Sequence, residues 1–188
     1  MLYHVSVQSG LKVLKPHLSS HRKPYVYAVD NMVTGLLFGA KTDDFDFMIF
    51  TDEENIPVIY ECYPNALQKV YQGQSCFVYE INGEGFQRGV TSWSAELVNE
   101  SEVKVENEIY IENLYQRLTE EEAQNNLKIF RYEFSDSYRK QITEHIVDRI
   151  IRFDIDLDHI MEQDHRFSDY YKDIVNALTN IMDGHLLQ

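Results

Sequence analysis

Cysteine is scarce in this chain of 188 residues, with Cys62 and Cys76 as its only two. Two cysteines are too few for a disulfide framework, so we expect a reducing compartment, with the cytoplasm as the default location. Thirteen residues separate the two cysteines, and both lie in strand-like segments. We therefore interpret them as small buried hydrophobic residues rather than as zinc ligands.

Long apolar runs and positive charges are also lacking. No run approaches the roughly 18 apolar residues of a membrane span, and residues 1–6 lack the basic start and apolar core of a signal peptide. The chain holds 17 Lys and Arg against 31 Asp and Glu, for a net charge of −14. This charge opposes binding to DNA or RNA, because phosphate contacts need clustered cations. We expect neither a nucleic-acid nor a membrane partner.

Several familiar catalytic and metal-binding motifs are absent. Residues 83–85 lack the third glycine of a dinucleotide fingerprint, and phosphate-loop lysines, nucleophile elbows and His-Glu-x-x-His helices do not occur. The alternating acids of 154–158 suggest a calcium loop, but His159 and His165 occupy the positions that need glycine and a bidentate acid. A solvated connection between helices explains this stretch better, and we expect no metal cofactor.

Short strand-like runs rich in branched and aromatic residues dominate the first two-thirds of the chain. They span 2–6, 25–29, 46–51, 57–62, 75–81, 90–98 and 103–111. Two hairpins are predicted, one joining 46–51 to 57–62 and one joining 75–81 to 90–98 through a tight turn at Asn82-Gly83. The expected fold class is α+β, mainly antiparallel sheet with short helices.

The helical predictions are fewer. Asp30-Asn31 is expected to cap a short helix, Thr119 with the three following acids is expected to begin another, and 7–16 is expected to be a helical or turn stretch ending at Pro16. Apolar residues recur every three or four positions from 135 to 153 and from 168 to 182, which predicts two C-terminal helices. We expect an α+β domain over 1–134 and a helical extension over 135–188.

A cluster of positive charge lies near the N-terminus of this acidic chain. No acid precedes Asp30, whereas four cations do, with His17 and His21 between them: Lys12, Lys15, Arg22 and Lys23. One interpretation is a solvated loop with ordinary lysines. The other is an anion pocket for a phosphate-bearing small molecule, since the acidic background repels long polyanions more than it repels a nucleotide.

Two predicted strands near this cluster carry polar and aromatic side chains on shared faces. His4 and Ser6 stand two residues apart in the first strand, and Tyr25 and Tyr27 do so in the second. Side chains two apart in a strand point the same way. If the strands are neighbours, an imidazole, a hydroxyl and one or two phenols line one patch that the cationic connection can reach.

This arrangement resembles the ADP-ribosyltransferase-like fold, in the branch of the poly-ADP-ribosyltransferases and tRNA 2′-phosphotransferases. That branch opens with a His-x-Ser/Thr strand, matched by 4–6, and continues with an aromatic-rich strand leading into a short helix, matched by 25–28. Tyr27 and Phe38 stand eleven apart, the spacing of the two aromatics that stack on nicotinamide in the polymerase-like members. The resemblance covers about residues 2–98 and implies NAD as substrate.

Residue roles follow from the resemblance. It implies that His4 and Ser6 contact the nicotinamide ribose, that Tyr25, Tyr27 and Phe38 surround the base, and that Arg22 or Lys23 meets the pyrophosphate. The acid that stabilises the ribosyl cation is expected to be Glu96, with Glu80 and Glu84 as alternatives. His4 and Glu96 are the catalytic candidates.

Two other classes of function stay open. The chain is alternatively a non-enzymatic interaction module whose C-terminal helices bind a partner or form a homodimer, with Ile146 and Leu178 at the interface. A third reading is an acidic protein that binds a basic partner through 100–125, an interaction that salt weakens.

Overall fold

The fold is described from a computed structural model, which covers residues 1–18, 23–42, 45–91, 93–153, 176 and 179. In this part of the chain no helix combines the length and apolar character that crossing a membrane requires. Contacts divide the chain into two units. The first holds Met1–Thr42, Phe50–Val58 and Leu67–Lys128, and the second holds Asp43–Ile49, Ile59–Ala66 and Ile129–Gln188. The division predicted at residue 134 stays a prediction.

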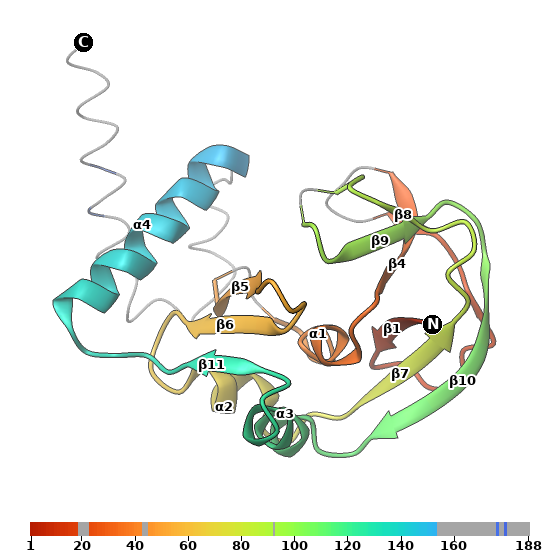
Figure 1. Ribbon diagram of the computed structural model, residues 1–188, viewed down its shortest axis with the longest axis horizontal. Coiled ribbons are helices and arrows are strands. Elements are labelled where there is room, and N and C mark those ends of the chain that lie inside the picture. The colour runs from red at the N-terminus through yellow and green to blue at the C-terminus, as the bar shows by residue number, and fades with distance from the viewer. Residues whose placement is uncertain (19–22, 43–44, 92, 154–175, 177–178, 180–188) are drawn as a thin grey trace, which may run out of the picture. The chain divides into compact units, whose positions relative to one another are not determined.

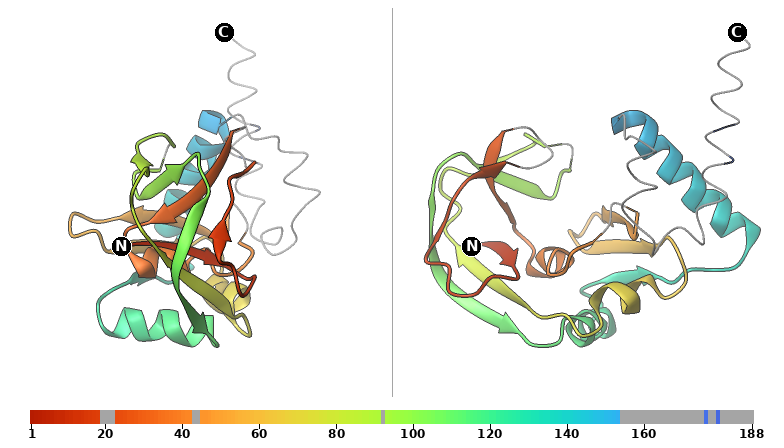
Figure 2. Two further views of the ribbon diagram at one scale, coloured as in Figure 1. Left: turned by 90° about the vertical axis from the view of Figure 1, so that its right-hand side faces the viewer. Right: turned by 180° about the vertical axis from the view of Figure 1, so that it is seen from behind.

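One antiparallel sheet forms most of the first unit (Figure 1). Its strand order is β2-β10-β7-β1-β4-β9-β8, with β3 attached to β4. The strands are β1 (Leu2–Ser6), β2 (Val13–Leu14), β3 (His17–Leu18), β4 (Pro24–Val29), β7 (Cys76–Ile81), β8 (Gln87–Arg88), β9 (Glu96–Asn99) and β10 (Val103–Ile111). Figure 2 shows the long β10 curving beside β7, with which it pairs. The α+β class expected from the sequence is confirmed.

Alternation along the strands separates a face packed in an apolar cluster from the face on which the first helix packs. Val26 and Ala28 of β4 are buried in an apolar cluster with Leu2 and Ile81. The intervening β4 residues point to the opposite face, because side chains alternate in a strand. That opposite face is where the first helix packs.

Helix α1 (Met32–Leu36) begins at Asn31, as the sequence predicts. The Asn31 side-chain oxygen accepts hydrogen bonds from two backbone N–H groups of the first turn, at 2.9 and 3.4 Å. Gly39 follows the helix and lies directly against β7 and helix α3 (Leu114–Ala123). A Cβ on Gly39 would lie 2.7 Å from Cys76 Sγ and 2.8 Å from Leu114 Cδ2. Only glycine allows the chain to pass this close.

The predicted hairpin at Asn82-Gly83 is wrong. Strand β7 pairs with β1 and β10, while the segment 90–98 contributes only the start of β9, which pairs with β4 and β8. A two-residue turn of the primed type I needs positive φ at both central residues, and neither Asn82 nor Gly83 has one. The connection is longer than a two-residue turn because β7 and the next strand, β8, are not neighbours in the sheet.

Two helical predictions also fail. Helix α3 begins at Leu114 instead of near Thr119, because Asn113 caps it by accepting the Gln116 N–H at 3.0 Å. Asparagine is among the best capping residues, so it starts the helix a turn and a half earlier. Within 7–16, the expected helical or turn stretch contains β2, whose Val13 and Leu14 pair with β10.

The second unit combines parts of a small sheet with a long helix. The sheet has the order β11-β6-β5, from β5 (Phe47–Thr51), β6 (Pro57–Glu61) and β11 (Lys128–Phe130). The predicted hairpin of 46–51 and 57–62 is therefore confirmed. Buried Asp46 accepts the Tyr63 hydroxyl at 2.5 Å, and the Tyr138 hydroxyl donates to the Glu61 carbonyl at 3.0 Å. Helix α2 (Ala66–Tyr71) follows β6.

Helix α4 (Asp136–Phe153) confirms the first predicted C-terminal helix. Its periodic apolar residues are buried, with Ile146 fully so: Tyr138, Ile142, Ile146 and Ile150. These residues are therefore covered within the chain, and a homodimer through the C-terminal helices stays a prediction. Apart from residues 176 and 179, the second predicted helix (168–182) lies outside the described residues, as does the acidic stretch 154–165.

Candidate functional site

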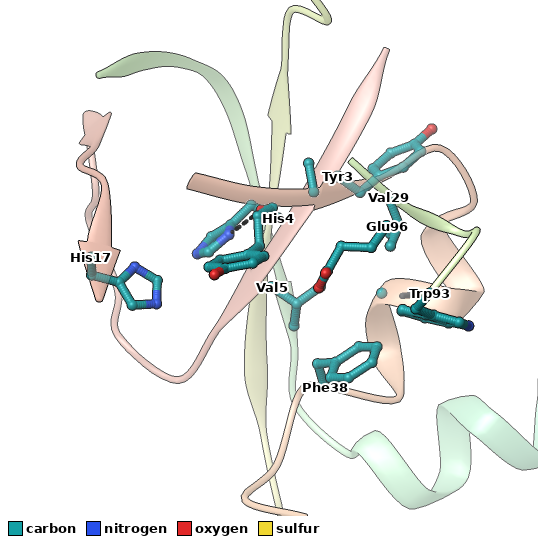
Figure 3. A pocket seen from close by; sticks show the side chains of 11 residues that line it. Tyr3, His4, Val5, His17, Val29, Phe38, Trp93 and Glu96 are labelled. Atoms are coloured by element: carbon teal, nitrogen blue, oxygen red, sulfur yellow. Dashed lines mark hydrogen bonds between the residues drawn. The ribbon is translucent and has the colours of Figure 1, made fainter. Parts of the chain in front are cut away.

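A pocket of about 300 Å³ lies where β1 and β4 diverge in the first unit (Figure 3). This volume is at the lower end for small-molecule sites, and fits a base with its sugar better than a whole dinucleotide. Its walls come from β1, β3, β4, α1 and β9 and from the loop before β9. The lining residues are Tyr3, His4, Val5, His17, Tyr27, Ala28, Val29, Gly35, Phe38, Trp93 and Glu96.

The pocket forms because β1 and β4, although neighbours in the sheet, are joined by a single registered pair. Strand β1 pairs with β7 along its whole length, but with β4 only at Tyr3 and Val29. This register puts Tyr3 and Val29 on one face, so alternation directs His4 toward the other face, beside Tyr79 of β7. Since the strands separate beyond that pair, the His4 ring occupies the opening between them.

His4 is held in one tautomer by this position. Its Nδ1 lies 2.8 Å from the carbonyl oxygen of Tyr27. A carbonyl only accepts, so Nδ1 carries the proton and Nε2 carries the lone pair. Burial lowers the pKa of His4 below its ordinary value, and the nearby His17 lowers it further, against a raising contribution from the bond to Tyr27. The ring is therefore neutral at pH 7 and offers an acceptor to a ligand hydroxyl.

Glu96 brings the carboxylate of the pocket. It opens β9 and pairs with Val29 of β4, so its side chain shares a face with Val29 and Tyr27. Figure 3 shows its carboxylate pointing into the space between His4 and Phe38. The half-buried setting of Glu96 strengthens its electrostatic effect on any charge that develops nearby.

Phe38 and Trp93 form an aromatic wall opposite His4. Their ring centroids are 5.4 Å apart at an angle of 53°. A ring inserted between them would need about 7 Å, twice an ordinary contact distance, so a ligand ring stacks on the wall rather than inside it. Tyr27 lies on the other side of the pocket, with His17 edge-on to its ring at 5.7 Å. The predicted pair of Tyr27 and Phe38 therefore lines one pocket from two sides.

Gly35 forms the floor of the pocket beneath the sheet. A Cβ at this position would lie 3.0 Å from a Val5 methyl and 3.2 Å from a Val29 methyl. The absence of a side chain lets α1 approach β1 and β4 closely. Phe38, one turn later, is thereby brought to the pocket wall.

The other predicted site residues that the structure describes lie outside the pocket lining. The Ser6 hydroxyl accepts the Gln8 N–H at 3.1 Å. Tyr25 is buried and contacts Tyr27 edge-on at 6.0 Å. Lys23 is paired with Glu100 at 2.6 Å, and the hydrogen bond that its ammonium donates to Glu100 raises the pKa of Lys23. Arg22 lies outside the described residues.

The structure also separates the three candidate acids. Glu80 accepts a hydrogen bond from Asn107 at 2.9 Å, and Glu84 lies exposed in the connection after β7. Neither is a lining residue of the pocket, whereas Glu96 is. The catalytic role of Glu96 stays a prediction.

Sequence reasoning missed Trp93 and His17 as lining residues. Trp93 is the only tryptophan of the chain and stands three residues before Glu96. Its rarity and this spacing are the sequence signals that could have marked it as a site residue. His17 was placed in the basic cluster, but two lysines of that cluster pair with acids near β9: Lys15 with Glu102 at 3.6 Å and Lys23 with Glu100. Both are ordinary ion pairs between exposed side chains.

Among the described residues, no group of three or more His, Cys, Asp or Glu side chains is arranged to hold a metal ion. Both cysteines are free and buried. Comparison of the chain with known protein families, with curated proteins and with solved structures gave no match.

Proposed function

We propose that the chain binds NAD in the pocket between β1 and β4 and is an ADP-ribosyltransferase-like protein. One observation carries the proposal: His4, Tyr27, Phe38 and Glu96, taken from four separate segments of the sequence, line a single pocket. Three of these four residues are polar or titratable.

The pocket chemistry suits the nicotinamide riboside half of NAD. Neutral His4 accepts a ribose hydroxyl at Nε2, because its Nδ1 proton is already bonded to Tyr27. The nicotinamide ring of NAD is a flat cation, and stacks favourably on the faces of Phe38 and Trp93. The carboxylate of Glu96 complements its charge. Among the described residues, no lysine or arginine lines the pocket.

Glu96 has a direct role in the proposed reaction. The bond between ribose C1′ and the nicotinamide nitrogen breaks, and nicotinamide leaves as a neutral base with the bonding electron pair. The positive charge then rests on the ribosyl oxocarbenium, which a preorganised carboxylate stabilises. A nucleophilic acceptor bonds to C1′ and loses its proton to solvent or to Glu96.

The test is titration calorimetry with NAD, combined with an assay for nicotinamide release. We expect wild-type protein to bind NAD, His4→Ala to lose binding, and Glu96→Gln to keep binding while losing on the order of 10²-fold or more in rate. Leu18→Ala, at an exposed position outside the pocket lining, is the matched control. A folded wild-type protein that binds no NAD would overturn the proposal, and binding that survives His4→Ala would place the ligand elsewhere.

A further inference from the structure

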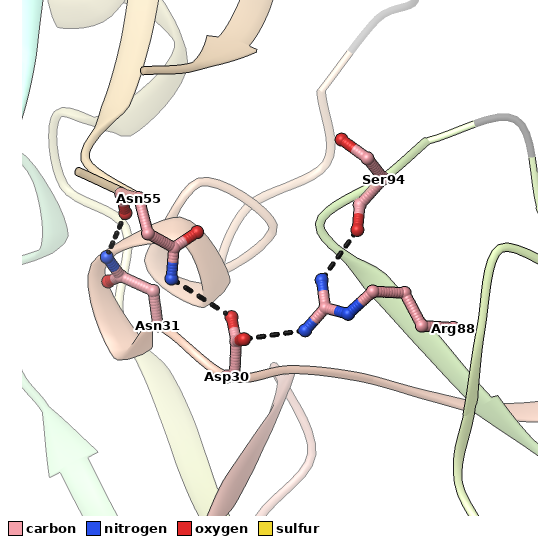
Figure 4. A network of polar contacts seen from close by, with 5 residues as sticks. All are labelled: Asp30, Asn31, Asn55, Arg88 and Ser94. Carbon is pink, nitrogen blue, oxygen red and sulfur yellow. Dashed lines mark hydrogen bonds and ion pairs between the residues drawn. The ribbon is translucent and has the colours of Figure 1, made fainter. Parts of the chain in front are cut away.

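Arg88 joins two parts of the first unit that meet at the pocket wall (Figure 4). It lies at the end of β8 and is followed by Gly89, whose φ of 76° turns the chain into the loop before β9. One guanidinium nitrogen donates to Asp30 Oδ2 at 2.6 Å, and the other donates to the Ser94 carbonyl at 2.6 Å. Arg88 itself does not line the pocket.

The contacts of Asp30 extend this link to the start of α1. Asp30 Oδ1 accepts from the Asn55 side chain at 3.3 Å, and the Asn55 carbonyl accepts from the Asn31 side chain at 2.7 Å. Asn31 in turn caps α1. A continuous chain of hydrogen bonds therefore runs from the loop that carries Trp93 to the helix that precedes Phe38.

We propose that Arg88 is a positioning residue that holds Trp93 against Phe38 and so builds the aromatic wall of the pocket. Ser94 directly follows Trp93, so anchoring its carbonyl fixes the backbone beside the indole. Asp30 directly precedes Asn31, the residue that caps α1. The guanidinium nitrogen that donates to Asp30 therefore ties the loop to the start of this helix. The consequence for a ligand rests on the proposed function, whereas the placement of Trp93 does not.

The geometry of the contact requires arginine. The guanidinium presents its donors in a rigid planar fork, whereas the lysine ammonium is a compact charge on a flexible stem. Arg88→Lys therefore keeps the charge and the attraction to Asp30 but loses the planar fork whose two nitrogens reach the carboxylate and the carbonyl separately. Because the pair is exposed, with 44% and 37% of the two side chains accessible, its contribution to overall stability is small.

The experiment uses the intrinsic fluorescence of Trp93, which as the only tryptophan reports on this wall alone. Emission and acrylamide quenching are measured without ligand for wild type, Arg88→Ala and Arg88→Lys. The matched control is Arg152→Ala, which removes an exposed arginine–aspartate pair of 2.7 Å on α4. We expect both Arg88 variants to shift the Trp93 emission to longer wavelength and to raise quenching, and Arg152→Ala to match wild type.

NAD titration of the same proteins provides the second readout. We expect Arg88→Ala to bind about tenfold more weakly, equivalent to about 1.4 kcal/mol, with the midpoint of thermal unfolding close to that of Arg152→Ala. Wild-type emission and quenching in Arg88→Ala would overturn the role of Arg88. Absence of NAD binding by the wild type would overturn the proposed function instead, and the Trp93 signal would still decide whether Arg88 positions the wall.

Discussion

The Nδ1–H of His4 reaches the carbonyl oxygen of Tyr27 at 2.8 Å, across the opening where β1 and β4 no longer pair. In an antiparallel ladder, residues two apart along a strand present their carbonyls to the same neighbour. Val29 pairs with Tyr3 of β1, so the Tyr27 carbonyl faces β1 as well. The imidazole therefore satisfies a backbone carbonyl of β4 that a backbone N–H of β1 would satisfy in a regular ladder.

The pH dependence of stability follows from this placement. The pKa of His4 in the folded protein is below its ordinary value of 6.5, so the unfolded chain takes up this proton at a higher pH. Stability contributed by neutral His4 is complete above pH 6.5 and decreases as the pH falls toward the folded pKa. We expect unfolding midpoints to decline on acidification less steeply in His4→Asn than in wild type. Parallel curves for the two proteins would contradict the prediction.

A buried hydroxyl in α1 destabilises the protein. Thr34 is 1% exposed, and its side-chain oxygen has no hydrogen-bond partner in the part of the chain that the structure describes. Valine has nearly the same shape without the polar atom, so Thr34→Val is expected to raise the free energy of unfolding by about 1 kcal/mol. Thr143→Val is the control, because the Thr143 hydroxyl donates to the Arg139 carbonyl at 2.8 Å on α4. Denaturant unfolding that shows a loss for Thr34→Val would contradict this reasoning.

Gly39 is expected to tolerate no side chain. A methyl group there would overlap Cys76 Sγ and Leu114 Cδ2, and overpacking of this kind costs about 1–3 kcal/mol. Gly39→Ala should therefore lower the unfolding midpoint, and the added change Cys76→Ala should recover part of the loss. Gly83→Ala serves as the control, since the nearest atoms to its Cβ are 3.5 Å away. Equal midpoints for Gly39→Ala and Gly83→Ala would refute the prediction.

The two cysteines are expected to resist modification in the native protein. Burial raises the pKa of the Cys76 thiol to about 11 and that of Cys62 further still. The reactive thiolate is therefore scarce near pH 8, and access to it is blocked. A chromogenic disulfide reagent should titrate both thiols after denaturation and neither one before it. Rapid reaction of the native protein would show that one of these sites opens readily.

Local features of the fold were predictable because they depend on neighbouring residues. The cap at Asn31, strand 2–6 and the apolar period along α4 each arise from patterns within a few positions. Pairing was not predictable in the same way: β9 was assigned to β7 through a local turn signal, whereas it pairs with β4, some seventy residues earlier. Long-range pairing depends on complementary surfaces that no short window contains.

The same distinction applies to the candidate site. His4, Tyr27, Phe38 and Glu96 could be named individually because the resemblance concerns short motifs and spacings. Trp93 and Arg88 belong to a connection whose place is decided by contacts with Asp30 and Phe38, more than fifty residues away. Lys23 shows the reverse case, since its charge suggested an anion site while the fold supplies Glu100 as its partner.

The uneven pairing of β1 with its two neighbours also affects how the sheet resists separation of its strands. Five registered pairs join β1 to β7, against one that joins it to β4, so the sheet is weakest along the line that passes through the pocket. A molecule bound there touches His4 and Val5 on one side of this line and Tyr27 and Glu96 on the other. We expect such a molecule to join the two sides of this line, so that a ligand of the pocket raises the free energy of unfolding.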